Sequence, residues 1–174
     1  MKSRKKKNLF ITGLITTLLG FSILAVFGWK RISHEIEKQR LLRECVIFEI
    51  PDLDIKAPVM DGTEHKVLSK AAGHFLDTGS VGKGNYCIAG HNSTIYAEIF
   101  NNMKNIQIGM KMYLIDNDDK RTKYTYIVTE NFIVDPNETW ILEDFGDDRI
   151  TIVTCTDNGK QRQIVVGILQ SQSK

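Results

Sequence analysis

The stretch that decides the fold of this chain is ITIVTCTDNGKQRQIVVG, at residues 150–167. Two runs of isoleucine, valine and threonine flank the sequence DNG at residues 157–159. β-Branched residues favour strands, whereas Asp, Asn and Gly favour turns. We therefore predict an antiparallel hairpin made of the strands Ile150–Thr154 and Gln163–Leu169.

Cys155 and Arg162 stand at the two facing ends of this predicted hairpin. A cysteine at a strand end is held rigidly and still reaches the surface, as a nucleophile requires. An arginine brought beside it by a tight turn would favour the thiolate and stabilise negative charge on an attacked carbonyl oxygen. Spacing alone leaves a second interpretation open, in which a buried cysteine and a surface arginine are ordinary parts of a hairpin.

A thiolate enzyme also needs an acid–base partner, which is most often a histidine. The chain has four histidines. His34 lies in a charged helical segment and His65 lies in a polar loop. His74 and His91 both follow a glycine, but only His91 stands at the end of an apolar run, YCIAGH at residues 86–91. We select His91 on this placement, with His74 as the alternative.

The rest of residues 45–174 consists of short apolar runs separated by turn residues, which favours strands over helices. Residues 117–120 are predicted to form a turn, and a short helix with Ile95, Ile99 and Met103 on one face is predicted after His91. Seven or eight strands in about 130 residues favour a closed or nearly closed barrel. Besides the hairpin, the predicted strands are Val46–Ile50, Ile55–Met60, Asn85–Ala89, Met112–Ile115 and Tyr124–Val134.

The N-terminal part of the chain has the pattern of a membrane anchor. Residues 2–7 carry five basic side chains, and residues 9–27 form a run of 19 without a charge. A helix that rises about 1.5 Å per residue nearly crosses a hydrocarbon core of about 30 Å with this length. A cleaved signal peptide is the alternative, but its apolar core is shorter, about 7–15 residues, and residues 27–30 (FGWK) are a poor cleavage site.

We therefore predict a mainly β protein with short helices, preceded by one transmembrane helix. Basic residues before the span should stay in the cytoplasm, so the domain after it should lie outside the cell in a single-pass topology. The predicted segments are a cytoplasmic basic tail at 1–7, a transmembrane anchor at 8–29, a solvated helical stalk at 30–44 and the folded domain at 45–174.

The charge distribution excludes a nucleic-acid-binding domain. Residues 1–44 hold 10 Lys and Arg against 3 Asp and Glu, whereas residues 45–174 hold 13 against 18. The folded domain is therefore net acidic, and nucleic-acid binding requires a basic face. A hydrophobic fraction of 42% with 25% charged residues is also typical of a folded chain rather than a disordered one.

Three cysteines, Cys45, Cys87 and Cys155, are too few for a disulfide scaffold, and an odd number leaves at least one unpaired. A bridge between Cys45 and Cys87 stays open beside the interpretation that both are buried free thiols. Neither alternative changes the selection of Cys155 as the candidate nucleophile.

Three motifs, in this order along the chain, resemble the sortase family of cysteine transpeptidases. Residues 85–92 (NYCIAGHN) resemble the sortase strand that carries the catalytic histidine. Residues 151–155 (TIVTC) resemble the motif T-L-x-T-C, with Ile152 in place of Leu, and residues 162–167 (RQIVVG) resemble the arginine strand. Each short motif alone is weak, but their order is specific, and the resemblance covers nearly all of residues 45–174.

The resemblance implies an eight-stranded barrel on the outer face of a Gram-positive membrane. It implies that Cys155 attacks the carbonyl after the threonine of an L-P-x-T-G-like sorting signal near the C-terminus of a secreted protein, which gives a thioester. His91 would then protonate the leaving amine, and Arg162 would bind the oxyanion. A cell-wall precursor or a pilin lysine would supply the acceptor amine, and Thr154 and Thr156 would line the peptide groove.

The subclass that the chain most resembles is class A. The segment between Val134 and Ile150 is too short for the inserted helix of class B, and no pilin-type N-terminal lid precedes the first strand. Ile152 and the short chain leave class D or an unusual class B open. Some class A enzymes bind calcium, but the carboxylates that could serve as ligands are scattered, so no metal or other cofactor is predicted at Asp77, Glu138, Glu143 and Asp144.

Other protein classes remain as alternatives. An L,D-transpeptidase also uses Cys, His and Arg, but it places the arginine two residues after the cysteine, where this chain has Asp157. A papain-like hydrolase places its cysteine before its histidine, and the order here is reversed. The third alternative is a non-catalytic β-domain that binds a partner at the cell surface, with Cys155 an ordinary thiol.

Overall fold

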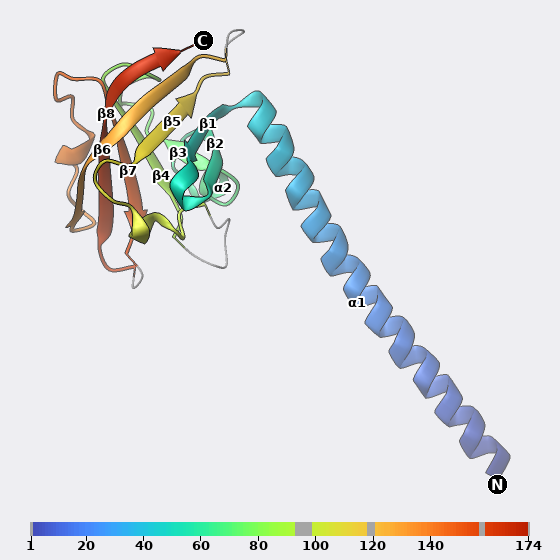
Figure 1. Cartoon of the computed structure of the whole chain (residues 1–174). Coiled ribbons are helices and arrows are strands. Elements are labelled where there is room, and N and C mark those ends of the chain that lie inside the picture. Colours follow the sequence, from blue (N-terminus) through green and yellow to red (C-terminus); the bar gives the residue numbers. More distant parts are fainter. Residues whose placement is uncertain (1, 93–98, 118–120, 157–158, 174) are drawn as a thin grey trace. The chain divides into compact units, whose positions relative to one another are not determined.

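The structure is a computed structural model that describes side chains from residue 13 onward and covers residues 2–92, 99–117, 121–156 and 159–173 (Figure 1). It divides into two compact units, Met1–Gln39 and Arg40–Lys174. Residues 118–120 of the predicted turn and Ile95 of the predicted helix face lie outside the described residues, whereas Ile99 lies in a turn and Met103 begins a 3₁₀-helix.

Helix α1 (Lys2–Glu44) is a single α-helix of 43 residues that runs through the predicted boundary between anchor and stalk without a break. Its part from Gly13 to Glu44 is the one described segment that is long and apolar enough to cross a membrane, which is compatible with an anchor. The last turn differs from the solvated stalk that the sequence predicts, because Leu41 and Leu42 are buried. That turn belongs to the second compact unit.

The second unit is a closed barrel of eight strands among the described residues, which confirms the predicted fold class. The order around the barrel is β1-β2-β3-β4-β7-β8-β6-β5, and β5 pairs with β1 to close it. Each of the eight strands therefore has a partner on both sides over at least part of its length. The strands are β1 Val46–Ile50, β2 Ile55–Asp61, β3 Ala72–His74, β4 Asn85–Gly90, β5 Lys111–Ile115, β6 Lys123–Val134, β7 Arg149–Cys155 and β8 Arg162–Ser173.

Short helices join these strands. They are the 3₁₀-helices η1 (Pro51–Leu53), η2 (Met103–Asn105) and η3 (Trp140–Leu142), and the α-helix α2 (His65–Leu68). The connection between β6 and β7 contains only η3, so it holds no long inserted helix, as its length predicts. Strand β3 and helix α2 were not predicted, because three or four residues are too few to show a period of 2 or 3.6.

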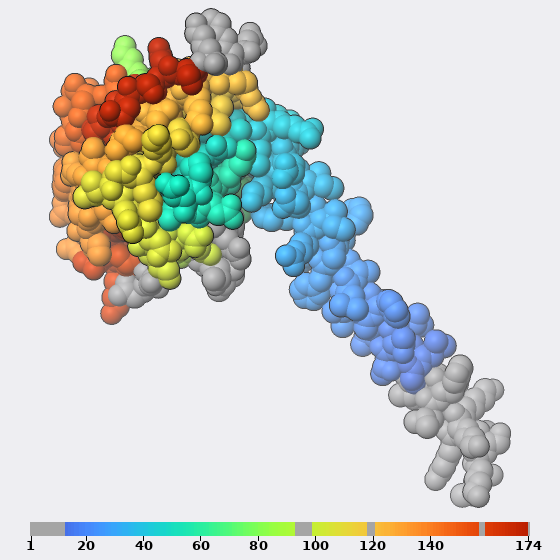
Figure 2. All heavy atoms as spheres, viewed as in Figure 1, coloured from blue at the N-terminus to red at the C-terminus, as the bar shows by residue number. Residues whose placement is uncertain are grey.

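The barrel interior is filled by one cluster of buried apolar side chains. Phe48 of β1 and Phe100, from the connection after β4, meet edge to face with ring centroids 5.8 Å apart. The same connection also contacts η1, because Asn102 Nδ2 donates to the Leu53 carbonyl oxygen at 3.0 Å. In Figure 2 the yellow-green atoms that precede β5 lie beside the teal atoms of residues near 60.

Gly90 ends β4 at a point where no side chain fits. A Cβ built on Gly90 would lie 2.3 Å from two carbons of the Phe100 ring, and Phe100 is fully buried against Phe48. We expect Gly90→Ala to lower the free energy of unfolding by about 1–3 kcal/mol, because overpacking forces the ring to shift. Urea denaturation of wild type and variant measures this difference.

The control for this prediction is the double variant Gly90→Ala/Phe100→Leu. A smaller side chain at 100 relieves the clash, so the two substitutions together should cost less than the sum of their separate costs. Additive costs, or a Gly90→Ala variant that unfolds at the wild-type urea concentration, would contradict the close approach.

Candidate active site

The pairing of three adjacent strands brings the predicted residues His91, Cys155 and Arg162 to one end of the barrel. Strands β4 and β7 are parallel neighbours in which Gly90 lies opposite Thr154, so His91 and Cys155 come next on the two strands. Strands β7 and β8 are antiparallel, and Cys155 lies directly opposite Arg162. A histidine, a thiol and a guanidinium therefore follow one another across the sheet.

Thr154 holds β4 beside β7 immediately before the cysteine. Its side chain is 2% exposed, and its hydroxyl donates to the Gly90 carbonyl oxygen at 2.9 Å. A second hydrogen bond joins the chain just after β4 to the end of β7, because Asn92 Nδ2 donates to the Cys155 carbonyl oxygen at 3.1 Å. The resemblance implies that Thr154 lines the peptide groove, and in the structure its buried side chain joins β4 to β7.

The turn after Cys155 is closed by its own backbone. The Thr156 N–H donates to the Gln161 carbonyl oxygen at 3.0 Å, and the Gly159 N–H donates to the Thr156 carbonyl oxygen at 2.7 Å. Gly159 has a φ of +69°, which glycine adopts without strain. Arg162 Nη1 lies 3.3 Å from the Gln161 carbonyl oxygen, which keeps the guanidinium at the turn. Thr156 itself is half-buried beside the cysteine.

His74, the alternative acid–base residue, occupies a different part of the sheet. Its ring stacks on Tyr86 with centroids 4.3 Å apart, and its Nδ1 lies 3.1 Å from Asp61 Oδ1. In the β3–β4 pairing His74 lies opposite Ile88, three residues before His91. Since β4 lies between β3 and β7, His74 is not beside Cys155.

A pocket of about 230 Å³ lies on the outer face of β7 and β8, under the β6–β7 connection. Thr151 lines it, and Thr151 projects on the same face of β7 as Cys155 because the two are four residues apart. Ile141, Ile164 and Val166 form a second buried apolar cluster at its base. Its aromatic lining comes from Phe132 of β6 and, in the connection, from Trp140 and Phe145.

A family model described as a sortase domain matches residues 48–170, which is most of the chain. This chain belongs to the sortase family. Among curated relatives, Sortase A of Bacillus anthracis is 36% identical over 140 residues, which cover 78% of this chain and 65% of the relative. Sortase A of Listeria monocytogenes is 32% identical over 128 residues, which cover 72% and 56%. The chain thus spans less than two thirds of the length of these relatives.

Solved sortase structures share the fold. Sortase A of Listeria monocytogenes superposes with a TM-score of 0.68 at 30% identity, over 74% of this chain and 88% of the other. A Sortase D5 transpeptidase of Clostridium perfringens gives a TM-score of 0.65 at 31% identity, over 79% and 89%. The Sortase A relatives support the class A resemblance that the sequence predicts.

A second histidine lies beside His91 in this sortase. The His65 and His91 rings have centroids 6.2 Å apart, and His65 begins α2 rather than lying in the loop that the sequence predicts. Burial lowers the pKa of His91, and the positive charge of His65 lowers it further. Both effects favour the neutral form of His91. Sequence reasoning missed His65 because no local pattern links α2 to the end of β4.

We expect His65→Gln to raise the pKa of His91 towards its ordinary value. The shift should be partial, because burial is the larger cause of the lowered pKa and remains in the variant. An NMR titration of the His91 Cε1–H resonance measures the change, with His34→Gln as the control. An unchanged His91 titration in His65→Gln would contradict the electrostatic contact between the two rings.

The three cysteines of the sortase are all free thiols, so no bridge joins Cys45 to Cys87. Cys87 is fully buried, and burial raises the pKa of its thiol to about 12, so it stays protonated near neutral pH. Cys45 is only half-buried, so the prediction of two buried thiols holds for Cys87 alone. Cys155 is half-buried at the strand end.

Among the residues that the structure describes, no group of three or more His, Cys, Asp and Glu side chains lies close enough to hold a metal ion. Of the carboxylates considered from the sequence, Asp144 accepts a hydrogen bond from the Gly146 N–H at 2.9 Å. That bond closes a local turn in the β6–β7 connection.

Proposed function

We propose that this sortase is a cysteine transpeptidase that cleaves an L-P-x-T-G-like sorting signal after its threonine and transfers the protein to an amine. The observation that carries this proposal is the strand register in which Cys155 pairs with Arg162 and Gly90 pairs with Thr154. Membership of the sortase family and the Sortase A relatives support it.

In the first half of the proposed reaction, His91 takes the proton of the Cys155 thiol and becomes the imidazolium. The Cys155 thiolate attacks the threonine carbonyl carbon, and negative charge moves to the carbonyl oxygen. Arg162 is the proposed donor to this oxyanion. When the carbon–nitrogen bond breaks, the His91 imidazolium gives its proton to the departing amine. The acyl group remains on Cys155 as a thioester.

In the second half, the acceptor amine attacks the thioester carbonyl carbon, and neutral His91 takes a proton from the amine. The thiolate of Cys155 then leaves, and a new amide bond remains. The lowered pKa of His91 suits this step, because the imidazole must be unprotonated to act as the base. The proposed acceptor is an amine of a cell-wall precursor or of a pilin lysine.

The pocket under the β6–β7 connection is the proposed subsite for the apolar residue of the signal. Thr151 lies four residues before Cys155, about 13 Å along a strand that rises about 3.3 Å per residue. In L-P-x-T the leucine lies three residues before the threonine, about 10 Å in an extended peptide. A threonine at Cys155 would thus bring the leucine to the near end of the pocket. Thr156 is a further proposed groove residue, and Thr154 is proposed to support the groove from within the strand pair.

The proposed topology keeps residues 1–7 in the cytoplasm, residues 8–29 in the membrane and residues 45–174 outside the cell. The basic cluster before the apolar run supports this orientation, because basic residues remain on the cytoplasmic side. The proposed stalk is residues 30–44. Because residues 40–44 belong to the compact barrel unit, the part of the stalk outside that unit is 30–39.

The test uses the full chain in detergent micelles with peptides varied around L-P-x-T-G and hydroxylamine as the amine. Transfer to hydroxylamine should give a threonyl hydroxamate, which mass spectrometry identifies and quantifies. The library also reveals the preferred signal. A folded chain that yields no hydroxamate from any of the peptides would contradict the proposed function.

We expect Arg162→Lys to lower kcat/KM by about 10- to 100-fold, because a lysine keeps the charge but loses the planar fork of donors. Arg162→Ala should lower it further. The alkylation rate of Cys155 by iodoacetamide serves as the control, since it reports thiolate formation and not oxyanion binding. A Lys variant with wild-type kcat/KM would contradict the oxyanion role, and an equal fall in alkylation would assign Arg162 to the thiolate alone.

A further inference from the structure

We propose that Asn85 is a positioning residue that fixes the β6–β7 connection and, through it, one wall of the apolar pocket. The link to the sorting signal rests on the proposed function. The hydrogen bonds of the Asn85 side-chain amide, which we call the clamp, rest on the contacts of Asn85 alone. Asn85 is the first residue of β4, and it does not line the pocket.

Few backbone hydrogen bonds join the β6–β7 connection to the barrel. Between Val134 and Arg149 its only regular element is the three-residue η3. The backbone hydrogen bonds around η3 are local ones, such as Leu142 N–H to the Thr139 carbonyl oxygen at 3.0 Å, and at the far end the Asp148 carbonyl oxygen accepts from the Leu169 N–H of β8 at 2.9 Å. Trp140 and Phe145 are 44% and 42% exposed. A connection of this length without regular structure needs contacts to the barrel to hold one conformation.

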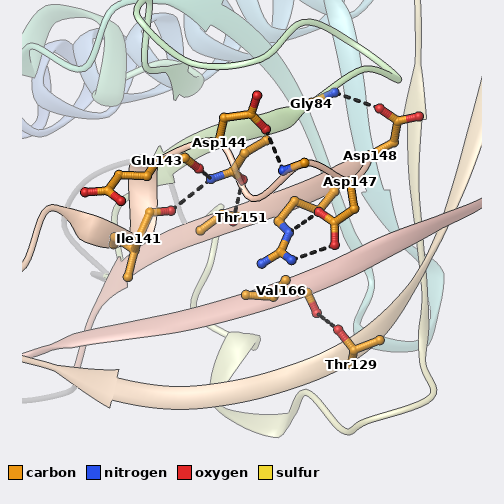
Figure 3. Close-up of polar contacts among 12 residues, drawn as sticks. Gly84, Thr129, Ile141, Glu143, Asp144, Asp147, Asp148, Thr151 and Val166 are labelled. Atoms are coloured by element: carbon orange, nitrogen blue, oxygen red, sulfur yellow. Dashed lines mark hydrogen bonds and ion pairs between the residues drawn. The ribbon is translucent and has the colours of Figure 1, made fainter.

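The Asn85 amide supplies those contacts from a buried position, at 2% exposure. Its Nδ2 donates to the Ile141 carbonyl oxygen at 3.0 Å and to the Glu143 carbonyl oxygen at 2.8 Å. Its Oδ1 accepts a hydrogen bond from the Thr151 hydroxyl at 2.7 Å. Figure 3 shows Ile141, Glu143 and Thr151 converging from the connection and from β7, with dashed lines for these bonds.

The bonding pattern determines both the orientation of the amide and the residue type. The two carbonyl oxygens need donors, and an amide has two N–H donors and one oxygen, so only one orientation satisfies all three partners. Aspartate would direct a negative charge at two carbonyl oxygens. Leucine, of similar volume, would remove the amide donors from both carbonyl oxygens. The Cys87 thiol, with its Sγ 4.0 Å from the Ile141 carbonyl oxygen, is only a weak donor in their place.

The clamped carbonyl groups flank the part of the connection that lines the pocket. Ile141 contributes both a clamped carbonyl and a lining side chain, and Trp140 and Phe145 lie within two residues of the clamped positions. Residue 84, next to Asn85, ties the far end of the same connection, because the Gly84 N–H donates to Asp148 Oδ1 at 2.9 Å. Asn85 therefore acts on the pocket through the connection.

The experiment compares Asn85→Ala with wild type by hydrogen exchange and by kinetics, using the full chain in micelles, an L-P-x-T-G peptide and hydroxylamine. We expect faster amide exchange in residues 138–145 and a rise in KM of about tenfold, the size of one or two lost buried hydrogen bonds. The kcat and the alkylation rate of Cys155 should stay within about twofold, because the clamp does not touch the reacting atoms. With a peptide in which alanine replaces leucine, the two proteins should have nearly equal KM values.

Thr151→Val and Thr151→Ser form the matched pair. Valine removes the hydroxyl that orients the amide and should speed amide exchange in residues 138–145 by a smaller factor, about threefold, whereas serine keeps the bond and should leave the exchange at its wild-type rate. If the Asn85→Ala variant does not fold, this pair still tests whether the Asn85 amide holds the β6–β7 connection.

Two results would overturn the inference. One is unchanged exchange in residues 138–145 of a folded Asn85→Ala variant. The other is a loss that is equal for the leucine and alanine peptides, which would assign Asn85 a purely structural role. Failure of the proposed function is a distinct outcome, because it appears as absent turnover in the wild type while the exchange data still decide whether the clamp exists.

Discussion

Replacing Cys155 with alanine is expected to lower hydroxamate formation from a sorting-signal peptide by at least about 10³-fold, to the limit of detection. In the proposed mechanism the Cys155 sulfur carries the acyl group. Cys155 is the residue of β7 that lies opposite Arg162, and among the described residues no other group at that position can form a thioester. The fold should be unaffected, because Cys155 is half-buried at the end of a strand and lies outside the buried core. Circular dichroism and the same peptide assay measure the two quantities.

Cys45→Ala is the matched control for this prediction. Cys45 is also a half-buried free thiol, but it lies before β1 and should leave turnover within about twofold of wild type. Cys87 offers no competing nucleophile, because burial raises the pKa of its thiol to about 12. A Cys155→Ala variant that retains more than about one per cent of the activity would contradict the thioester route.

His91→Ala is expected to lower turnover of the amide peptide by about 10³-fold, within the range for loss of a general acid–base group. The amine that leaves in the first step is a poor leaving group unless it receives a proton, and His91 is the proposed donor. The variant should also lose the pH dependence that comes from the imidazole. Steady-state kinetics across pH 6–9 measure both effects.

A substrate with a better leaving group separates proton donation from other roles of His91. An aryl ester of the same peptide releases a phenolate that needs no proton, so the acylation defect of His91→Ala should shrink to below about tenfold. The burst of phenol in a single turnover gives this rate, with His34→Ala as the control variant. An equal defect for ester and amide would contradict the role of His91 as the general acid.

Much of the barrel could be predicted from local pattern. Strand β1 has the predicted bounds, and β7 and β8 extend the predicted hairpin by only a few residues. These segments carry β-branched residues between turn residues, which is a signal that a single sequence contains. Strand β3 could not be predicted, because its three residues are paired through β2 and β4 rather than by any pattern of their own.

The candidate site could be predicted where it depends on neighbours in sequence. The register of Cys155 with Arg162 follows from a short turn. The parallel pairing of β4 with β7 joins residues more than 60 positions apart, so the placement of His91 beside Cys155 came from the resemblance and from the end of an apolar strand. The sequence did not predict Asn85, although it is the polar first residue of a strand in which every residue is buried.

In the proposed mechanism Cys155 carries the acyl group of the sorting signal as a thioester. The direct measurement mixes the full chain in micelles with an L-P-x-T-G peptide, quenches it with acid within a fraction of a second and records the intact protein mass. We expect an added mass equal to the peptide through its threonine, which is lost on adding hydroxylamine and which proteolysis maps to Cys155. Product formation without this adduct, or with the adduct on another residue, would contradict a thioester on Cys155.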